Sequence, residues 1–106
     1  MGTRKIESSL DAVVIALCLD YGRRQSAIES RSATKRTDTE YRYYNFKMLD
    51  AVSEIAGERF AERYIYEIGK RIGYAKSSLT CFSETTYKIY KRRIIDNIAK
   101  KLHLCD

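Results

Sequence analysis

A cluster of hydroxyl-bearing and basic residues near the end of the chain has the composition of a surface that binds polyanions. Hydroxyl groups hydrogen-bond to phosphates and base edges, and guanidinium groups bind phosphate or guanine through two parallel hydrogen bonds. These residue types, at this density, predict an element that contacts DNA. The cluster consists of Thr85, Thr86, Lys88, Lys91, Arg92 and Arg93.

The spacing of the cluster predicts a helix over residues 83–102, with Ser83 as its N-cap. At 100° per residue, Thr85, Lys88 and Arg92 share one side of this helix, opposite an apolar stripe. Lys91 falls inside the apolar arc, so either its stem lies along the core while its ammonium group reaches out, or it marks the edge of the packed surface. The alternative is a solvated face, because amphipathic surface helices commonly carry Lys and Arg on their wet side.

A second basic group stands in a polar segment without apolar periodicity, residues 30–39, which we expect to be a loop. Its members are Arg31, Lys35 and Arg36, and flexible basic arms of this kind contact phosphate or the minor groove. A solvated loop is the alternative interpretation. Residues 21–42 hold six basic and three acidic residues, and residues 83–102 hold six and two. The positive charge therefore lies in two blocks.

The elements that must position these residues are helices, because apolar residues recur every three or four positions and proline is absent. We expect helices over about 4–20, 23–30, 38–56, 58–72 and 83–102. Tyr21-Gly22 breaks the first, the capping-box pattern of residues 37–40 starts the third, and Gly57 and Gly73 are helix stops. Gly69, inside a helix, indicates a close packing contact. The predicted fold is all-α: one small bundle of about five helices that ends in a helix-turn-helix-like pair.

Composition excludes several classes of protein. The 106 residues suffice for one domain, and no apolar run approaches the length of a membrane span. Acidic residues interrupt the N-terminal apolar run, so we expect no signal peptide and a cytoplasmic protein. Cys18, Cys81 and Cys105 lack the spacing of a zinc site or disulfide framework. His103 is the one histidine, and no acid pair or phosphate-binding loop accompanies it, so we expect neither an enzyme nor a cofactor.

Residues 83–102 (SETTYKIYKRRIIDNIAKKL) resemble the C-terminal segment of phage late transcriptional regulators of the RinA and ArpU type. Residues 20–24 (DYGRR), 40–45 (EYRYYN) and 72–77 (IGYAKS) are similar to further pieces of that pattern. The resemblance implies a fold related to the DNA-binding end of sigma factors, with Thr85, Thr86, Lys88 and Arg92 facing DNA. One departure is the connection from Ile72 to Ser83, which is longer than the tight turn of an ordinary helix-turn-helix.

The charge surplus of +6 and the resemblance together favour a sequence-specific, double-stranded DNA-binding regulator of phage or prophage origin. A single reading helix usually gains affinity by dimerising or by contacting RNA polymerase, so both partners are open. The alternative is a helical protein-interaction module, such as a polymerase adaptor or a phage assembly component, whose positive charge is incidental. Salt separates the two, because phosphate contacts weaken steeply as salt rises.

Overall fold

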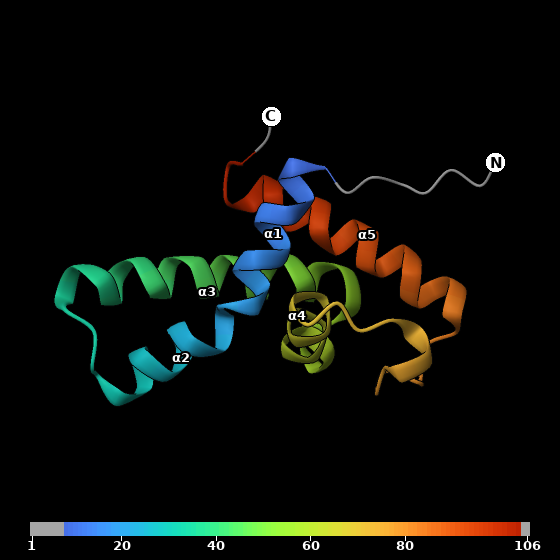
Figure 1. Ribbon diagram of the computed structural model, residues 1–106, viewed down its shortest axis with the longest axis horizontal. Helices are drawn as coiled ribbons and strands as arrows, with labels where there is room; N and C mark the ends of the chain where they lie inside the picture. Colours follow the sequence, from blue (N-terminus) through green and yellow to red (C-terminus); the bar gives the residue numbers. More distant parts are fainter. Residues whose placement is uncertain (1–7, 105–106) are drawn as a thin grey trace.

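The computed structural model describes residues 8–104, and these form helices joined by short connections (Figure 1). The predicted all-helical class is confirmed. Residues 4–7 of the first predicted helix lie outside the described range. In chain order the elements are α1 (Ser9–Leu19), α2 (Tyr21–Ser30), α3 (Lys35–Ala56), the 3₁₀ turn η1 (Glu58–Phe60), α4 (Ala61–Gly69), the 3₁₀ turn η2 (Tyr74–Lys76) and α5 (Glu84–Lys101).

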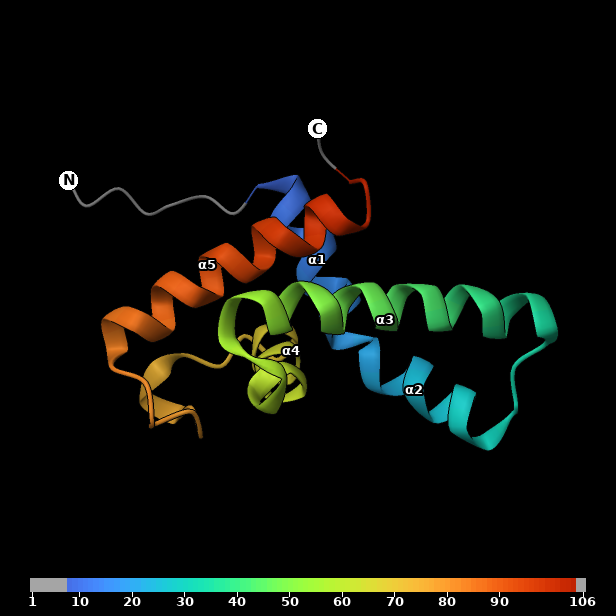
Figure 2. The ribbon, with the colours of Figure 1, turned by 180° about the vertical axis from the view of Figure 1, so that it is seen from behind.

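The longest helix, α3, is the element on which the others pack. Helices α2, α4 and α5 all contact it, and α1 lies against both α4 and α5 (Figures 1 and 2). The molecule measures 50 × 29 × 21 Å along its principal axes. The α2–α3 connection lies at one end of the long axis, and the start of α5 lies at the other (Figure 1). The core comes from all the α-helices, with Val14, Met48, Ile65, Ile68 and Ile94 at most 1% exposed.

The joint between α1 and α2 is tied by a buried arginine. Arg24 is 3% exposed, and its guanidinium donates to the Leu17 carbonyl (2.7 Å) and to Oδ1 of Asn45 on α3 (2.8 Å). The sequence places the break at Tyr21-Gly22, but the two helices meet at Asp20, and both residues lie inside α2. The backbone therefore turns one residue earlier than predicted, because Tyr21 is needed in the core at 7% exposure.

Gly69 confirms the prediction of a close packing contact. A Cβ atom built there would lie 2.5 Å from the Leu19 backbone nitrogen and 2.6 Å from its Cα. Real Cβ atoms do not approach backbone atoms so closely, so α1 and α4 meet at a distance that only glycine permits. The end of α3 at Gly57 is also as predicted, since Gly57 has a φ of +94°.

The start of α3 differs from the prediction. Thr34, not Thr37, is the N-cap, and its hydroxyl accepts a hydrogen bond from the Thr37 amide at 3.2 Å. Lys35 and Arg36 therefore belong to the first turn of α3 and not to a loop over residues 30–39. Two threonines three residues apart offer alternative caps, and the first of them lengthens the helix by one turn. Arg31 ends α2 in the left-handed conformation, with a φ of +55°.

The end of α4 also differs. The predicted helix over 58–72 is divided into η1 and α4, and it stops at Gly69 rather than at Gly73. Arg71 takes the left-handed conformation (φ +57°). The amides of Arg71 and Ile72 donate to the carbonyls of Ile68 (3.1 Å) and Glu67 (2.9 Å), as in a Schellman cap. Gly73 has an ordinary negative φ of −84°, so it does not cap the helix.

The start of α5 is as predicted, because Ser83 is its N-cap and accepts from the Thr86 amide at 3.2 Å. The apolar stripe is also confirmed, since Tyr87, Ile94, Ile95, Ile98 and Leu102 are all buried. Among the helices of residues 8–104, none combines the length and apolar character that a membrane span requires.

Candidate nucleic-acid interface

The positive charge gathers in one stretch of chain, residues 70–93. This stretch holds seven basic residues and one acidic residue, a net charge of +6, which equals that of the whole chain. It comprises the connection after α4, which we call the 70–83 connection, and the first half of α5. The basic residues are Lys70, Arg71, Lys76, Lys88, Lys91, Arg92 and Arg93. The rest of the chain is neutral in sum, because acidic residues elsewhere offset the basic surplus of residues 21–42.

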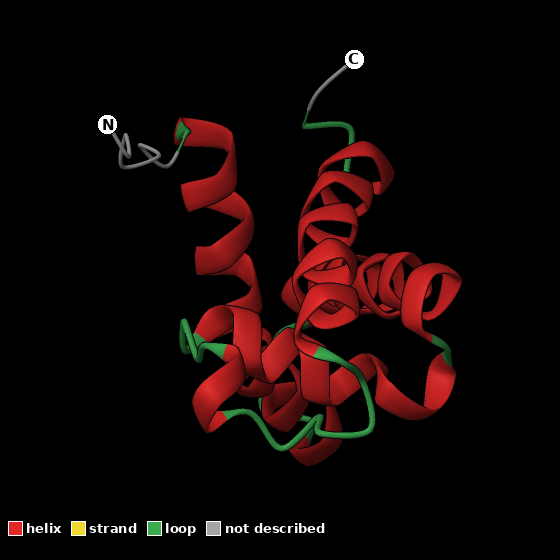
Figure 3. Ribbon diagram, turned by 90° about the vertical axis from the view of Figure 1, so that its right-hand side faces the viewer, coloured by secondary structure: helices red, strands yellow, loops and turns green. Residues whose placement is uncertain are grey.

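The 70–83 connection folds back against the start of α5 and forms one end of the molecule with it (Figures 1 and 3). The Tyr74 hydroxyl donates to the Phe82 carbonyl at 2.7 Å, which closes the connection on itself. Lys91, on α5, donates from Nζ to the Ile72 carbonyl at 2.9 Å. Rings from the two segments also meet, since Tyr74 and Tyr87 lie with centroids 5.4 Å apart. We refer to residues 70–93 together as the basic end.

A buried carboxylate holds the basic end in place. Glu67, on α4, is fully buried and accepts hydrogen bonds from the Ser77 hydroxyl (2.6 Å), the Ser78 amide (3.0 Å) and the Tyr87 hydroxyl (2.9 Å). Arg63 adds an ion pair at 2.9 Å. Burial acts to raise the pKa of Glu67, but these donors outweigh it and leave the pKa below its ordinary value. Sequence reasoning missed Glu67, although a lone acid among apolar helix positions was a visible signal.

The predicted hydroxyl contacts differ in availability. Thr85 is exposed, whereas Thr86 is half-buried and its Oγ1 accepts a hydrogen bond from the Ser83 hydroxyl at 3.0 Å. Lys88 is exposed and forms an ion pair with Glu84 at 2.8 Å, in which both side chains are at least 60% exposed. A pair so exposed contributes little stability, so Lys88 can exchange Glu84 for a phosphate at small cost.

Lys91 and Arg92 are engaged within the protein. Lys91 lies within the apolar arc, but its ammonium group donates to the Ile72 carbonyl instead of reaching outward toward DNA. Burial lowers the pKa of Lys91, and the Glu67 carboxylate acts in the opposite direction. The Arg92 guanidinium donates to both carboxylate oxygens of Asp11 at 2.7 Å and also to Asp96. Arg92 therefore joins α5 to α1. This ion pair competes with the predicted contact of Arg92 with DNA.

Arg93 and Lys76 are the basic-end residues best placed to meet an outside anion. Both are exposed, and neither forms an ion pair with a carboxylate of residues 8–104. Ile89 is also exposed, at 50%. The exposed residues of the basic end thus include Thr85, Lys88, Ile89 and Arg93 on α5 and Lys76 on the connection, with Lys88 and Arg93 on different sides of α5.

The second predicted basic group lies elsewhere. Arg31, Lys35 and Arg36 are exposed at the α2–α3 connection, at the opposite end of the long axis (Figure 1). The Nε atom of Arg36 lies 3.6 Å from Oε1 of Glu40. Neither Arg31 nor Lys35 forms an ion pair with a described carboxylate. The structure does not bring this group together with the cluster on α5. The prediction that a basic arm lies beside the reading helix is therefore wrong, because the two basic groups lie at opposite ends of the molecule.

The His, Cys and acidic side chains of the described residues were the candidates for a metal site. No three His, Cys, Asp or Glu side chains of residues 8–104 come close enough together to hold a metal ion. Cys18 is buried, and burial raises the pKa of its thiol to about 12, whereas Cys81 is exposed. His103 ends α5 in the left-handed conformation (φ +57°), and Cys105 lies outside the described residues.

Comparison with known proteins identifies no family for this chain, since no family model, no curated protein and no solved structure matches it.

Proposed function

We propose that this protein binds double-stranded DNA through its basic end and regulates transcription. The observation that carries the proposal is the net charge of +6 in residues 70–93, of which Lys76, Lys88 and Arg93 are exposed. A polyanion is attracted to such a surface, and its binding is driven by the release of counterions. The first turn of α5 adds free backbone amides and an exposed Thr85, which favour a phosphate or a base edge there.

In this proposal α4 and α5 act as a helix-turn-helix-like pair with an unusually long connection. Helix α4 is the supporting element, because its buried Ile65 and Ile68 fix it in the core. Glu67 then sets the position of the connection and of Tyr87 on α5. Helix α5 enters the major groove by its N-terminal half, where Lys88 and Arg93 reach bases or phosphates. The resemblance to phage RinA and ArpU regulators is consistent with this role and suggests a phage or prophage operon as the target.

A second candidate function is a protein-interaction module in which the charge is incidental. The observation that favours it is a group of exposed apolar side chains away from the basic end, among them Phe46, at 68% exposure. The two functions are compatible, because they use different surfaces. A cytoplasmic location, a homodimer and a contact with RNA polymerase belong to the proposal as further expectations.

Selection of random duplex DNA at about physiological salt, roughly 0.15 M, tests the proposal on the full chain. We expect an enriched motif, whose symmetry reports whether a dimer reads it. The triple variant Lys76→Ala/Lys88→Ala/Arg93→Ala should lose most of this affinity, and the slope of its salt dependence should fall by up to about 0.9 for each phosphate that is no longer bound. Absence of any motif, together with only weak binding, would contradict sequence-specific recognition.

The opposite end of the molecule supplies a matched control. The variant Arg31→Ala/Lys35→Ala/Arg36→Ala removes the same charge at the α2–α3 connection, far from the basic end (Figure 1). We expect it to change affinity only modestly, through the long-range field. Equal losses in the two triple variants would mean that total charge, and not the basic end, determines binding.

A further inference from the structure

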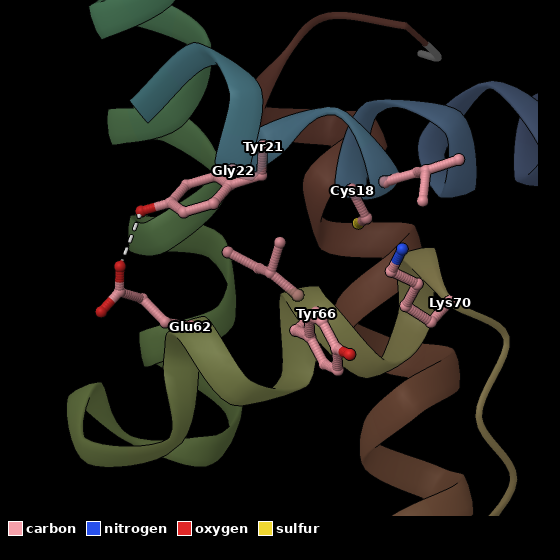
Figure 4. A pocket seen from close by; sticks show the side chains of 8 residues that line it. Cys18, Tyr21, Gly22, Glu62, Tyr66 and Lys70 are labelled. Carbon is pink, nitrogen blue, oxygen red and sulfur yellow. Dashed lines mark hydrogen bonds between the residues drawn. The ribbon is translucent and has the colours of Figure 1, made fainter. Parts of the chain in front are cut away.

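Three adjoining hollows lie among α1, α2, α3 and α4, and Lys70 is the one residue of the basic end that lines them. Three hollows of about 260, 530 and 260 Å³ share lining residues, so they form one surface feature. Tyr21 and Glu62 join the first hollow to the second, and Gln25, Phe46 and Leu49 join the second to the third. Figure 4 shows the first hollow, with Glu62 at one end and Lys70 at the other. We call this feature the acidic trough.

The walls of the acidic trough are more apolar than a solvated surface requires. Leu19, Phe46 and Tyr66 are 55%, 68% and 47% exposed, and all three line it. They come from α1, α3 and α4, so the apolar surface is assembled by the fold and does not arise from one helix. Clusters of exposed large apolar side chains usually mark a surface that another molecule covers.

The charged residues that line the central hollow are all acidic, whereas Lys70 lines the first hollow and Arg42 the third. Glu58 and Glu62 both line the central hollow and are exposed, and neither forms an ion pair with a described Lys or Arg. Glu62 accepts only a long hydrogen bond from the Tyr21 hydroxyl, at 3.3 Å (Figure 4). Asp50, which also lines this hollow, shares Lys101 with Glu54. In a chain with 20 basic and 14 acidic residues, unpaired carboxylates gathered beside apolar side chains are a specific pattern.

We infer that the acidic trough docks a basic, amphipathic segment of a partner protein. Large apolar side chains of this segment lie against Phe46, Leu19 and Tyr66, and its Lys or Arg side chains pair with Glu58 and Glu62. Desolvation by the apolar walls strengthens such pairs relative to pairs in open water. DNA is excluded as the occupant, because Glu58 and Glu62 repel phosphate. The inference goes beyond the proposed function and does not depend on it.

The helices that line the trough are short. Its walls include α2, of 10 residues, and α4, of 9 residues. At 1.5 Å per residue these helices are roughly 15 and 13.5 Å long, so a docked helix of about 9–10 residues would run along the full length of either. A helix-in-groove complex of this kind places apolar anchors at spacings of three and four residues.

A display library of random peptides of about 14 residues, selected on the full-length chain at roughly 0.15 M salt, tests this inference. We expect enriched peptides that carry Lys or Arg beside Leu, Phe or Trp at helical spacing. An enriched peptide should bind Glu58→Gln/Glu62→Gln and Phe46→Ser at least about 10-fold more weakly, a loss of roughly 1.4 kcal/mol. Because these side chains are exposed, the variants should fold.

Matched controls come from exposed residues outside the trough. Glu40→Gln/Glu84→Gln changes the charge by the same amount, and Tyr43→Ser removes a ring of α3 that is 44% exposed and does not line the trough. Both controls should bind the peptide as the native chain does. Enrichment of acidic peptides, no enrichment, or equal binding by the trough variants and the controls would overturn the inference.

Two further measurements distinguish a partner segment from a second copy of the chain and from DNA. Sedimentation measures whether the native chain self-associates, and we expect no self-association that depends on Phe46. If the native chain does self-associate and Phe46→Ser abolishes this, a second copy of the chain covers the trough and the inference is wrong. Lys76→Ala/Lys88→Ala/Arg93→Ala should retain peptide binding, and Phe46→Ser should retain DNA binding. If the DNA measurements fail and the peptide measurements succeed, only the proposed function is wrong. If the peptide measurements fail and the DNA measurements succeed, only this inference is wrong.

Discussion

Two buried polar side chains, Glu67 and Arg24, join separate elements of the fold by hydrogen bonds. Glu67 and Arg24 are both nearly inaccessible, and each has several hydrogen-bond partners. Tyr64 is the exception, because its hydroxyl is buried and has no hydrogen-bond partner. Satisfied groups of this kind add specificity, whereas an unpaired buried hydroxyl costs stability. The two cases lead to opposite expectations for similar substitutions.

The two stacked tyrosines of the core allow a direct comparison. Tyr64 and Tyr87 lie with ring centroids 5.5 Å apart, and only Tyr87 donates a hydrogen bond, to Glu67 and the Ile72 carbonyl. Tyr64→Phe should raise the free energy of unfolding by about 1 kcal/mol, because it removes an unsatisfied group. Tyr87→Phe should lower it by about 1–2 kcal/mol, because Glu67 loses a donor. Urea unfolding measures both, and a loss of equal size in the two variants would refute the distinction.

The pKa of Glu67 predicts how stability depends on pH. Burial raises this pKa, but the hydrogen bonds from Ser77, Ser78 and Tyr87 lower it further, so it lies below the ordinary value of 4.5. The unfolded state therefore binds the proton more readily, and the stabilisation is present above about pH 4.5 and lost as the pH falls below it. Glu67→Gln should lower stability at neutral pH and make unfolding less dependent on pH in the acidic range. Ser77→Ala should act in the same direction; an unchanged acid profile in both variants would contradict the assignment.

At the scale of elements, the close contact between α1 and α4 rests on one glycine. Gly69→Ala gains helix propensity of roughly 1 kcal/mol, but its Cβ would meet the Leu19 backbone at 2.5 Å. Backbone cannot yield as a flexible side chain does, so we expect a net loss of about 1–3 kcal/mol. Gly22→Ala is the control, because it is also helical and has no atom within 4 Å of its Cβ position. It should be neutral or slightly stabilising in thermal unfolding.

Periodicity was sufficient to predict the all-helical class, but not the division of residues 58–72 or all of the helix ends. The apolar stripe of α5, the Ser83 cap, the stop at Gly57 and the close contact at Gly69 all follow from local sequence. The start of α3 was missed because two threonines compete as its cap. The end of α4 was missed because Arg71 adopts a conformation usually left to glycine. Local residue preference did not decide either case.

The predicted site depended on contacts that local sequence does not contain. Lys88 and Arg93 are exposed as expected, whereas Arg92 and Lys91 have partners 81 and 19 residues away in the chain. Glu67 organises the basic end through residues 10 to 20 positions later. A helical wheel shows which side chains face outward, but not which of them meet an oppositely charged group on another helix.

At the scale of the whole molecule, charge distinguishes two regions of the surface. The basic end carries the whole net positive charge, and the acidic trough gathers unpaired carboxylates on α4 and η1. Separate regions keep a polyanion and a basic segment from competing for one surface. The central hollow lies along α2, α3 and α4, and Lys70 is the residue that the basic end shares with the first hollow.

The ion pair between Arg92 and Asp11 joins the first described helix to the last and can be tested as a unit. Both carboxylate oxygens of Asp11 accept from Arg92, whose side chain is 45% exposed while that of Asp11 is 17% exposed. For a bidentate pair of this exposure we expect about 1 kcal/mol of coupling. Arg92→Gln and Asp11→Asn should each lower stability, and the double variant should cost less than their sum. Urea unfolding of the four proteins measures the coupling.

Strictly additive losses in that cycle would mean that Arg92 does not act through Asp11, and its role as a DNA contact would return to consideration. A measured coupling instead makes Lys88→Ala/Arg92→Ala a poor test of DNA binding, since it weakens the attachment of α1 to α5 together with any bond to DNA. Lys88→Ala/Arg93→Ala avoids this ambiguity, because Arg93 forms no ion pair with a described carboxylate. Its loss of affinity should appear without a change in the unfolding curve.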